Sequence, residues 1–308
     1  MGSEGYKGLR EQKRSEAFSL VELLVVLAIM SVLMGVLLPA LGKVRRRARV
    51  MLGMSNQREI GNGVTLCALD NDSLYPPSVA TIGATDNWNW SDPRKMTALY
   101  RTNLGPHRAM SEYLRDYVKD ASVVFCPSGP KKYKYLQEAW DAGDNWNNPD
   151  TWLLADAMNG TYCFYWNYTG LLEGRLFKGP GNLAGGRGQS KVLVSDYLGF
   201  AHWQNEKCYG GNYYAYGSCE HFKGANVTPG EPQYPAGSAY WSGLKSDSFD
   251  LDAFDAKLHA CYADGHVESF AAAETATMKV IKNRFTNEPY EYDEHGPGYF
   301  YVPINGLR

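Results

Sequence analysis

The longest apolar stretch in the chain runs from Phe18 to Leu38 and is followed by Pro39. As a helix rising about 1.5 Å per residue, this stretch would span roughly 31 Å, which is close to the thickness of a bilayer's hydrocarbon core. The one charged residue within it is Glu22, near its start. Because a carboxylate is costly in lipid, Glu22 is a candidate functional residue. The pattern predicts a membrane-spanning helix that carries one functional acid.

The helix is predicted to continue beyond Pro39. Small and apolar residues recur there at spacings of three and four, which places them on one face of a helix: Leu41, Val44, Ala48, Met51 and Ser55. Gly61 and Gly63 weaken the helix late in its course. Short polar residues and two prolines between positions 70 and 77 favour a turn that ends it. We therefore expect a long helix over residues 18–75, with its membrane span at 18–40.

Residues 76–308 are predicted to form a globular domain with both helices and strands. The short elements follow from local periodicity, β-branched and aromatic content, and proline positions. Helices are expected over residues 110–118 and 271–284, strands over 122–127, 161–168 and 191–196, and an irregular surface insertion over 131–160. The predicted fold class is α+β, with the second half of the long helix packed on an antiparallel sheet.

A β-hairpin is predicted for residues 257–270. Asp264-Gly265 suits a two-residue type I′ turn, in which both central residues need positive φ. That turn would pair Tyr262 with Val267. It would also place Leu258, Ala260 and Tyr262 on the same face as Val267.

The residues before the apolar stretch are polar and carry four basic side chains, Lys7, Arg10, Lys13 and Arg14. A basic start followed by an apolar run is typical of secretory signal peptides, but their apolar cores are only about 7–15 residues long. No small-x-small cleavage site directly follows the apolar run. We therefore expect the apolar segment to stay in the mature protein.

The segment Ala17-Phe-Ser-Leu-Val-Glu22-Leu-Leu-Val-Val26 resembles the type III (prepilin) signal of type IV pilins and type II secretion pseudopilins. In that family a membrane peptidase cuts just before the Phe, and the new N-terminus is methylated. The resemblance implies cleavage between Ala17 and Phe18, N-methylation of Phe18, an assembly role for Glu22 and a helix-kinking role for Pro39. One departure is Ala17, where the family usually has Gly. The alternative is an ordinary signal anchor that is never cut.

The same resemblance implies a pilin-like fold, a topology and partners. Residues 1–17 would be a cytoplasmic leader, the helix a single pass through the bacterial inner membrane, and residues 76–308 a periplasmic domain. The expected partners are the prepilin peptidase and other pilin or pseudopilin subunits. The Glu22 carboxylate would meet the positively charged N-terminus of a neighbouring subunit; alternatively, it only reaches the head groups. Residues 56–77 and the Ala263-Asp-Gly-His-Val267 string resemble elements of pseudopilin-like proteins that are abundant in planctomycetes.

The charges that flank the span favour the opposite orientation. Residues 43–49 carry five basic groups and no acid, whereas the leader's four basic groups are offset by Glu4, Glu11 and Glu16. The positive-inside rule would therefore keep the large domain in the cytoplasm. Because the prepilin motif is more specific than a charge count, we expect the domain to be exported. The basic run could contact lipid head groups or a neighbouring subunit, or be only a solvated face.

Candidate metal and disulfide sites are weakly indicated. His259, Cys261 and His266 could share a face of the hairpin, but no fourth ligand is evident. A late acidic cluster is a weak calcium candidate whose spacing does not match an EF-hand: Asp247, Asp250, Asp252 and Asp255. None of the six cysteines forms a Cys-x-x-Cys pair. Cys208 and Cys219 are the nearest pair, and free buried thiols are the alternative.

The predicted function is structural. The net charge of −2 gives no electrostatic argument for nucleic-acid binding, and hydrolase, P-loop and zinc-protease motifs are missing. We therefore expect no enzyme activity and no cofactor. The first hypothesis is a processed subunit of a pilus or type II secretion pseudopilus. The alternative is a minor or non-polymerising pilin-like protein that binds a ligand such as a glycan, which exposed aromatic rings in residues 133–168 would favour.

Overall fold

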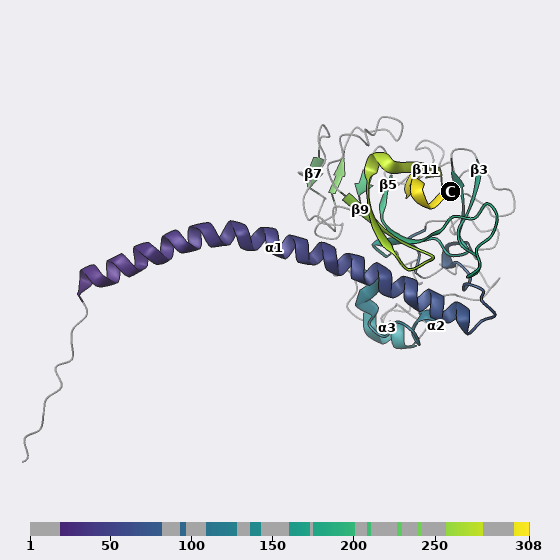
Figure 1. The fold of residues 1–308 in the computed structure, drawn as a ribbon, viewed down its shortest axis with the longest axis horizontal. Helices are drawn as coiled ribbons and strands as arrows, with labels where there is room; N and C mark the ends of the chain where they lie inside the picture. Colours follow the sequence, from purple (N-terminus) through teal and green to yellow (C-terminus); the bar gives the residue numbers. More distant parts are fainter. Residues whose placement is uncertain are drawn as a thin grey trace, which may run out of the picture. The chain divides into compact units, whose positions relative to one another are not determined.

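The computed structural model describes residues 19–81, 93–96, 109–127, 136–142, 160–172, 175–200, 208–210, 227–229, 239–241, 257–279 and 299–307. Figure 1 shows the helices early in the chain and the strands after them. The helices are α1 (Leu20–Leu69), α2 (Ser111–Leu114) and α3 (Leu136–Ala142). The chain forms two compact units, Met1–Arg47 and Ala48–Arg308. This content confirms the α+β class.

Helix α1 is one element of 50 residues with Pro39 inside it. It ends at Leu69, six residues before the predicted limit of residue 75. Asn71 Nδ2 donates a hydrogen bond to the Cys67 carbonyl at 2.6 Å and closes the last turn. Asp72 and Ser73 then take positive φ values of 52° and 62°, which a right-handed helix does not allow. The polar residues of this turn therefore end the helix before the two prolines are reached.

The described strands form two antiparallel sheets. The first has the order β1-β4-β9-β10, and the second has the order β3-β2-β11-β12-β5-β6-β8-β7. The strands of the first sheet are β1 (Tyr162–Phe164), β4 (Val192–Asp196), β9 (Lys257–Tyr262) and β10 (Val267–Ala271). Those of the second are β2 (Thr169–Leu172), β3 (Arg175–Lys178), β5 (Leu198–Phe200), β6 (Cys208–Gly210), β7 (Val227–Pro229), β8 (Ala239–Trp241), β11 (Thr275–Lys279) and β12 (Tyr299–Pro303).

The last part of α1 lies between strands on one side and the short helices α2 and α3 on the other (Figure 1). Two glycines allow both close approaches. A Cβ on Gly61 would lie 2.6 Å from Cys261 Sγ in β9, and a Cβ on Gly63 would lie 2.5 Å from Val118 Cγ2, just after α2. The weak helix formers predicted to loosen α1 are therefore the residues that let it pack. The predicted helix-on-sheet arrangement is confirmed.

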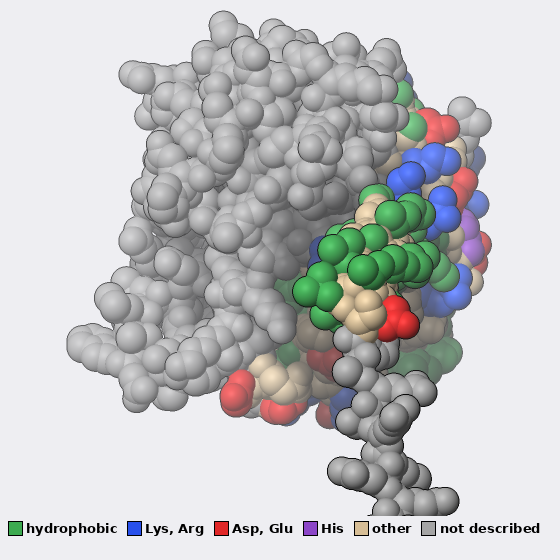
Figure 2. Space-filling model, turned by 90° about the vertical axis from the view of Figure 1, so that its left-hand side faces the viewer, with side chains coloured by type: hydrophobic (Ala, Val, Ile, Leu, Met, Phe, Trp, Pro, Cys, Tyr) green, Lys and Arg blue, Asp and Glu red, His purple; other side chains and the backbone are tan. Residues whose placement is uncertain are grey.

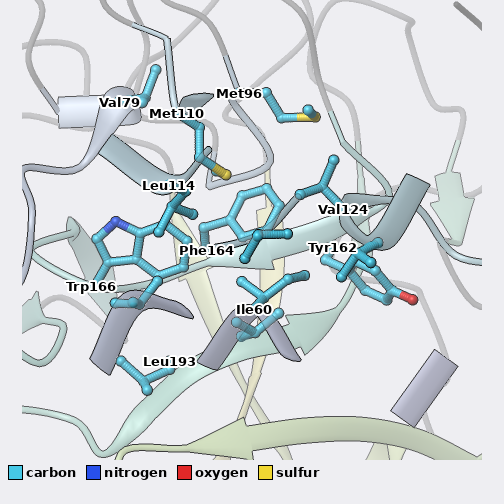
Figure 3. Close-up of a cluster of buried hydrophobic side chains, with 14 of the residues drawn as sticks. Ile60, Val79, Met96, Met110, Leu114, Val124, Tyr162, Phe164, Trp166 and Leu193 are labelled. Carbon is cyan, nitrogen blue, oxygen red and sulfur yellow. The ribbon is translucent and has the colours of Figure 1, made fainter. Parts of the chain in front are cut away.

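The hydrophobic core forms where α1 meets the first sheet (Figure 3). Ile60 of α1, Leu114 of α2, Phe164 of β1 and Leu193 of β4 are all buried there. Fully burying a large apolar side chain contributes about 1.5–3 kcal/mol relative to leaving it exposed. Trp140 of α3 is also fully buried, and its Nε1 donates to the Val118 carbonyl at 2.7 Å. The predicted irregular surface insertion over 131–160 therefore contains a regular helix that is anchored in the core by Trp140, while Gln137, Glu138 and Asp141 are exposed.

Several predicted elements are confirmed with narrower bounds. The helix predicted at residues 110–118 is α2, and the strand predicted at 191–196 is β4. The strand predicted at 161–168 covers only β1, because the chain turns at Asn167, which takes a φ of 48°. The local sequence pattern therefore predicts where these elements lie, but it does not predict the residues at which they begin and end.

Two predicted elements are wrong. Residues 122–127 were predicted as a strand, but Ala121–Val124 form a 3₁₀ helix. The Asp120 carboxylate caps it by accepting the Ser122 N–H at 2.8 Å. Within the predicted helix 271–284, Ala272–Glu274 form a 3₁₀ turn and β11 follows. Pairing of β11 with both β2 and β12 overrides the helix propensity of the alanines.

The hairpin β9–β10 forms at the predicted place with a different register. Val267 pairs with Cys261, and not with Tyr262 as predicted. The Gly265 N–H donates to the Tyr262 carbonyl at 2.9 Å, and Gly265 has a φ of 84°, so the loop has three residues and ends in a left-handed glycine. A shift of one residue moves side chains to the other face of a sheet. Val267 therefore shares a face with Cys261.

We expect Gly265→Ala to lower the free energy of unfolding by about 1–2 kcal/mol, because a Cβ disfavours the left-handed conformation. Chemical denaturation of the purified chain measures this change. Gly265→Asn is the matched control. Its free energy of unfolding should fall less than that of Gly265→Ala, because Asn tolerates positive φ. Equal stability of the alanine variant and the unsubstituted protein would contradict the observed turn.

Candidate functional site

The start of α1 is held by a reciprocal pair of hydrogen bonds. Ser19 Oγ accepts the Val21 N–H at 3.3 Å, and Glu22 Oε2 accepts the Ser19 N–H at 2.9 Å. The pattern Ser-x-x-Glu is that of a capping box, which satisfies amide groups that the first turn of a helix leaves unpaired. The carboxylate is also favoured there by the helix dipole. Glu22 thus caps its own helix, a role that Ser-x-x-Glu in the sequence indicates but that our sequence analysis missed.

Glu22 also has capacity for a second partner. Its side chain is exposed, and it forms no ion pair with any residue that the structure describes. Oε2 accepts the capping hydrogen bond, whereas no hydrogen bond from a described residue is recorded to Oε1. A cation or an N–H group of another molecule can therefore approach this carboxylate without breaking the cap.

The side chains of α1 between Glu22 and Lys43 are mostly apolar and exposed, and Figure 2 shows part of this hydrophobic surface. The helix is long and apolar enough to cross a membrane, and its most apolar window has 0% of its residues buried inside the protein. Leu20 is 78% exposed and Leu38 is 67% exposed. An uncovered apolar surface of this extent is typical of a segment that contacts lipid or other subunits. By length and composition, α1 therefore meets the requirements of the predicted membrane span.

Pro39 lies inside α1, and the helix continues on both sides of it. Because proline has no N–H, the Gly35 carbonyl loses its intrahelical donor. A Cβ on Gly35 would meet nothing within 4 Å, so none of the described residues packs against the helix at this position. The predicted kink at Pro39 stays a prediction.

A second polar constellation, which we call the buried node, joins α1 to the first sheet. Gln57 Nε2 of α1 donates to Asp196 Oδ1 of β4 at 2.9 Å. Asp196 Oδ2 accepts the His259 backbone N–H of β9 at 2.9 Å and lies 2.9 Å from His259 Nδ1. All three residues are buried, and Gln57 is fully so. The node fixes helix α1 against two neighbouring strands.

The node changes the interpretation of the hairpin histidines. His259 hydrogen-bonds to Asp196, whereas His266 stacks on Tyr262 with ring centroids 4.4 Å apart. Because His266 lies opposite Tyr262, it is on the other face of the hairpin from His259 and Cys261. The suggested metal site on this hairpin is therefore wrong, and the described residues contain no group of three His, Cys, Asp or Glu side chains that could hold a metal.

The Asp264 carboxylate in the turn of the hairpin interacts with His266. His266 Nδ1 lies within hydrogen-bonding distance of Asp264 Oδ1, which also accepts the His266 N–H. Partial burial opposes a charged Asp264, but the hydrogen bonds from His266 outweigh it, and the pKa of Asp264 is lowered. This arrangement stabilises the turn.

Four cysteines in the described residues are buried thiols: Cys67, Cys126, Cys163 and Cys261. Burial raises the pKa of Cys261 to about 12, so its thiol is protonated and acts as packing volume. The suggested Cys208–Cys219 bridge involves residue 219, which lies outside the described residues. The calcium candidates Asp247, Asp250, Asp252 and Asp255 also lie outside them, as do Ala17 and Phe18.

The described aromatic rings of the Trp- and Tyr-rich region are buried. Rings that stack on a sugar must be exposed, yet five large aromatic side chains here are each at most 1% exposed: Trp140, Tyr162, Tyr165, Trp166 and Tyr168. Tyr165 and Phe177 pack edge to face with centroids 5.7 Å apart. These rings build the core and give no support to the glycan-binding alternative.

Comparison with protein families matches residues 12–38 to the prokaryotic N-terminal methylation motif. The matched range contains the candidate residues Ala17, Phe18 and Glu22 and ends just before Pro39. The curated proteins and the solved structures each gave no match. The motif therefore covers the capped start of α1 and most of its apolar surface.

Proposed function

Because the chain is a type IV pilin-like protein that carries the prokaryotic N-terminal methylation motif, we propose that it is a structural subunit of a pilus or of a type II secretion pseudopilus. The observation that carries this proposal is the position of the motif, which lies on an apolar helix that nothing in its own unit covers. The prepilin peptidase would cut between Ala17 and Phe18, and Phe18 would then be methylated. The role is structural and needs no catalytic residue.

In this role α1 would occupy two environments, the membrane before assembly and the filament after it. In the membrane its apolar surface contacts lipid; in a filament the same surface contacts α1 of neighbouring subunits. Neither state exposes the apolar side chains to water, so the transfer does not oppose the hydrophobic effect. The protein would cross the inner membrane once, with its N-terminus in the cytoplasm and its globular unit in the periplasm.

Glu22 supplies the polar contact that sets the register between helices. The positively charged N-terminus at Phe18 of one subunit would meet the Glu22 carboxylate of its neighbour. Opposite charges attract far more strongly in a low-dielectric environment than in water. Helices that slide out of register would leave both charges unpaired in an apolar surrounding, which is strongly unfavourable.

We expect Glu22→Ala to abolish most incorporation into filaments while leaving cleavage and methylation largely intact. Incorporation is measured in sheared filament fractions from the native host, and processing by the N-terminal mass of the membrane-bound chain. Ser19→Ala is the matched control, because it removes one capping hydrogen bond and keeps the carboxylate. Normal incorporation of the Glu22→Ala chain, or equal loss in both variants, would contradict the register role.

The N-terminal mass also tests the proposal as a whole. We expect a mature chain that begins at Phe18 and carries one methyl group. A chain that retains residues 1–17 would exclude prepilin processing and leave an ordinary signal anchor. The orientation indicated by the basic residues after the span would then be the better prediction.

A further inference from the structure

The cationic side chains of α1 begin where its apolar surface ends. Residues 20–42 would span about 34 Å as a helix, close to the thickness of a hydrocarbon core. Lys43 is the next residue, and basic residues follow at positions 45, 46, 47 and 49. No acidic residue occurs between Glu22 and Glu59. If the span crosses a bilayer, this basic segment, residues 43–49, emerges at the level of the phosphate groups.

The basic segment presents charge on opposite sides of the helix. Lys43 and Arg47 are four residues apart and share one side, as do Arg45 and Arg49. A step of two residues turns a helix by about 200°, so these two pairs lie on opposite sides. All four side chains are exposed. None of them forms an ion pair with a residue that the structure describes.

We propose that the basic segment binds the phosphates of anionic phospholipids at the membrane surface. In the membrane state lipid head groups surround the helix, which suits charges that lie on opposite sides of it, whereas a single protein partner would contact one side. Guanidinium groups bind phosphate with two parallel hydrogen bonds. The inference rests on the membrane anchoring in the proposed function and is independent of filament assembly. The segment would hold the subunit at a fixed depth and gather anionic lipid around it.

The proposal is tested with the full chain reconstituted in phosphatidylcholine vesicles that contain a trace of spin-labelled lipid. Electron paramagnetic resonance gives the association of labelled phosphatidylglycerol with the protein relative to labelled phosphatidylcholine. One basic residue near an anionic surface strengthens association about fivefold. We therefore expect a severalfold preference for phosphatidylglycerol. Salt at 1 M should remove this preference, because the Debye length is then only about 3 Å.

The variant Lys43→Gln/Arg45→Gln/Arg47→Gln should lose most of this preference. A charge-matched control is Arg175→Gln/Lys178→Gln/Arg187→Gln, which removes three exposed cations of the globular unit and should keep the preference. Three results would each overturn the proposal: no preference in the unsubstituted chain, an unchanged preference in the first variant, or equal losses in both. Salt-sensitive binding of polyglutamate without lipid preference would likewise overturn it and indicate a protein partner. Because no step measures processing or filaments, its failure is separable from failure of the proposed function.

Discussion

Asp196→Ala is expected to lower the free energy of unfolding by about 3–5 kcal/mol, because each buried polar group left without its hydrogen-bond partner costs about 1–3 kcal/mol. The Asp196 carboxylate contacts Gln57 Nε2, the His259 N–H and His259 Nδ1. Its loss leaves these polar groups buried without their acceptor, and it also opens a cavity between helix and sheet. Denaturant unfolding of the full chain in detergent, followed by tryptophan fluorescence, measures the change.

Asp116→Ala is the matched control for this prediction. Asp116 is exposed, and its distance of 3.9 Å from the exposed Lys119 makes a surface pair of little expected value. We expect the denaturant midpoint of the Asp116→Ala variant to stay close to that of the unsubstituted chain. If the Asp196 variant unfolds at the same denaturant concentration as the Asp116 variant, the buried node does not stabilise the fold.

Gly61→Ala is expected to lower the free energy of unfolding by about 1–3 kcal/mol, although the same change in an open helix raises stability by about 1 kcal/mol. The new methyl group would lie 2.6 Å from Cys261 Sγ, well inside normal contact distance. Relief requires either rotation of the fully buried Cys261 thiol into packed neighbours or movement of α1 away from β9, and the movement would stretch the buried node and loosen the core around Ile60. The unfolding measurement used for Asp196 also applies here.

Two further variants separate this clash from a general effect on the helix. Gly53→Ala should be neutral or stabilising, because its Cβ would meet Pro127 and Tyr162 at an ordinary 3.7 Å. Cys261→Ala should rescue Gly61→Ala, since the Cys261 Cβ lies 3.9 Å from the added methyl group. A Gly61→Ala chain as stable as the Gly53→Ala chain would show that α1 does not approach β9 this closely.

The amino-terminal features were predictable because their signals are local. The apolar stretch from Phe18 predicts a long apolar helix by its length alone, and Glu22 is conspicuous as its one charge. The hairpin was predictable in place but not in register. Asp264-Gly265 fits a two-residue turn and also a three-residue loop, and only the left-handed φ of Gly265 with its hydrogen bond to Tyr262 distinguishes them.

The buried node could not be predicted from sequence. Gln57 and Asp196 are 139 residues apart, and Asp196 and His259 are 63 apart, so no spacing rule connects them. The same reason explains the wrong helix prediction at residues 271–284. Alanines favour a helix locally, but Ala276 and Met278 pair with Val302 and Phe300 from the end of the chain. Partners that are distant in sequence override a weak local preference.

The cap at the start of α1 makes no use of residues 1–17. Both capping hydrogen bonds use atoms of Ser19, Val21 and Glu22 alone. Removal of residues 1–17 would therefore break neither bond, and the helix of the precursor and that of the mature chain would begin at the same residue. The peptidase would change the charge and chemistry of the chain end without changing the helix that would cross the membrane. Processing would then permit assembly by changing the chemistry of the N-terminus. The helix would not need to refold between the membrane and the filament.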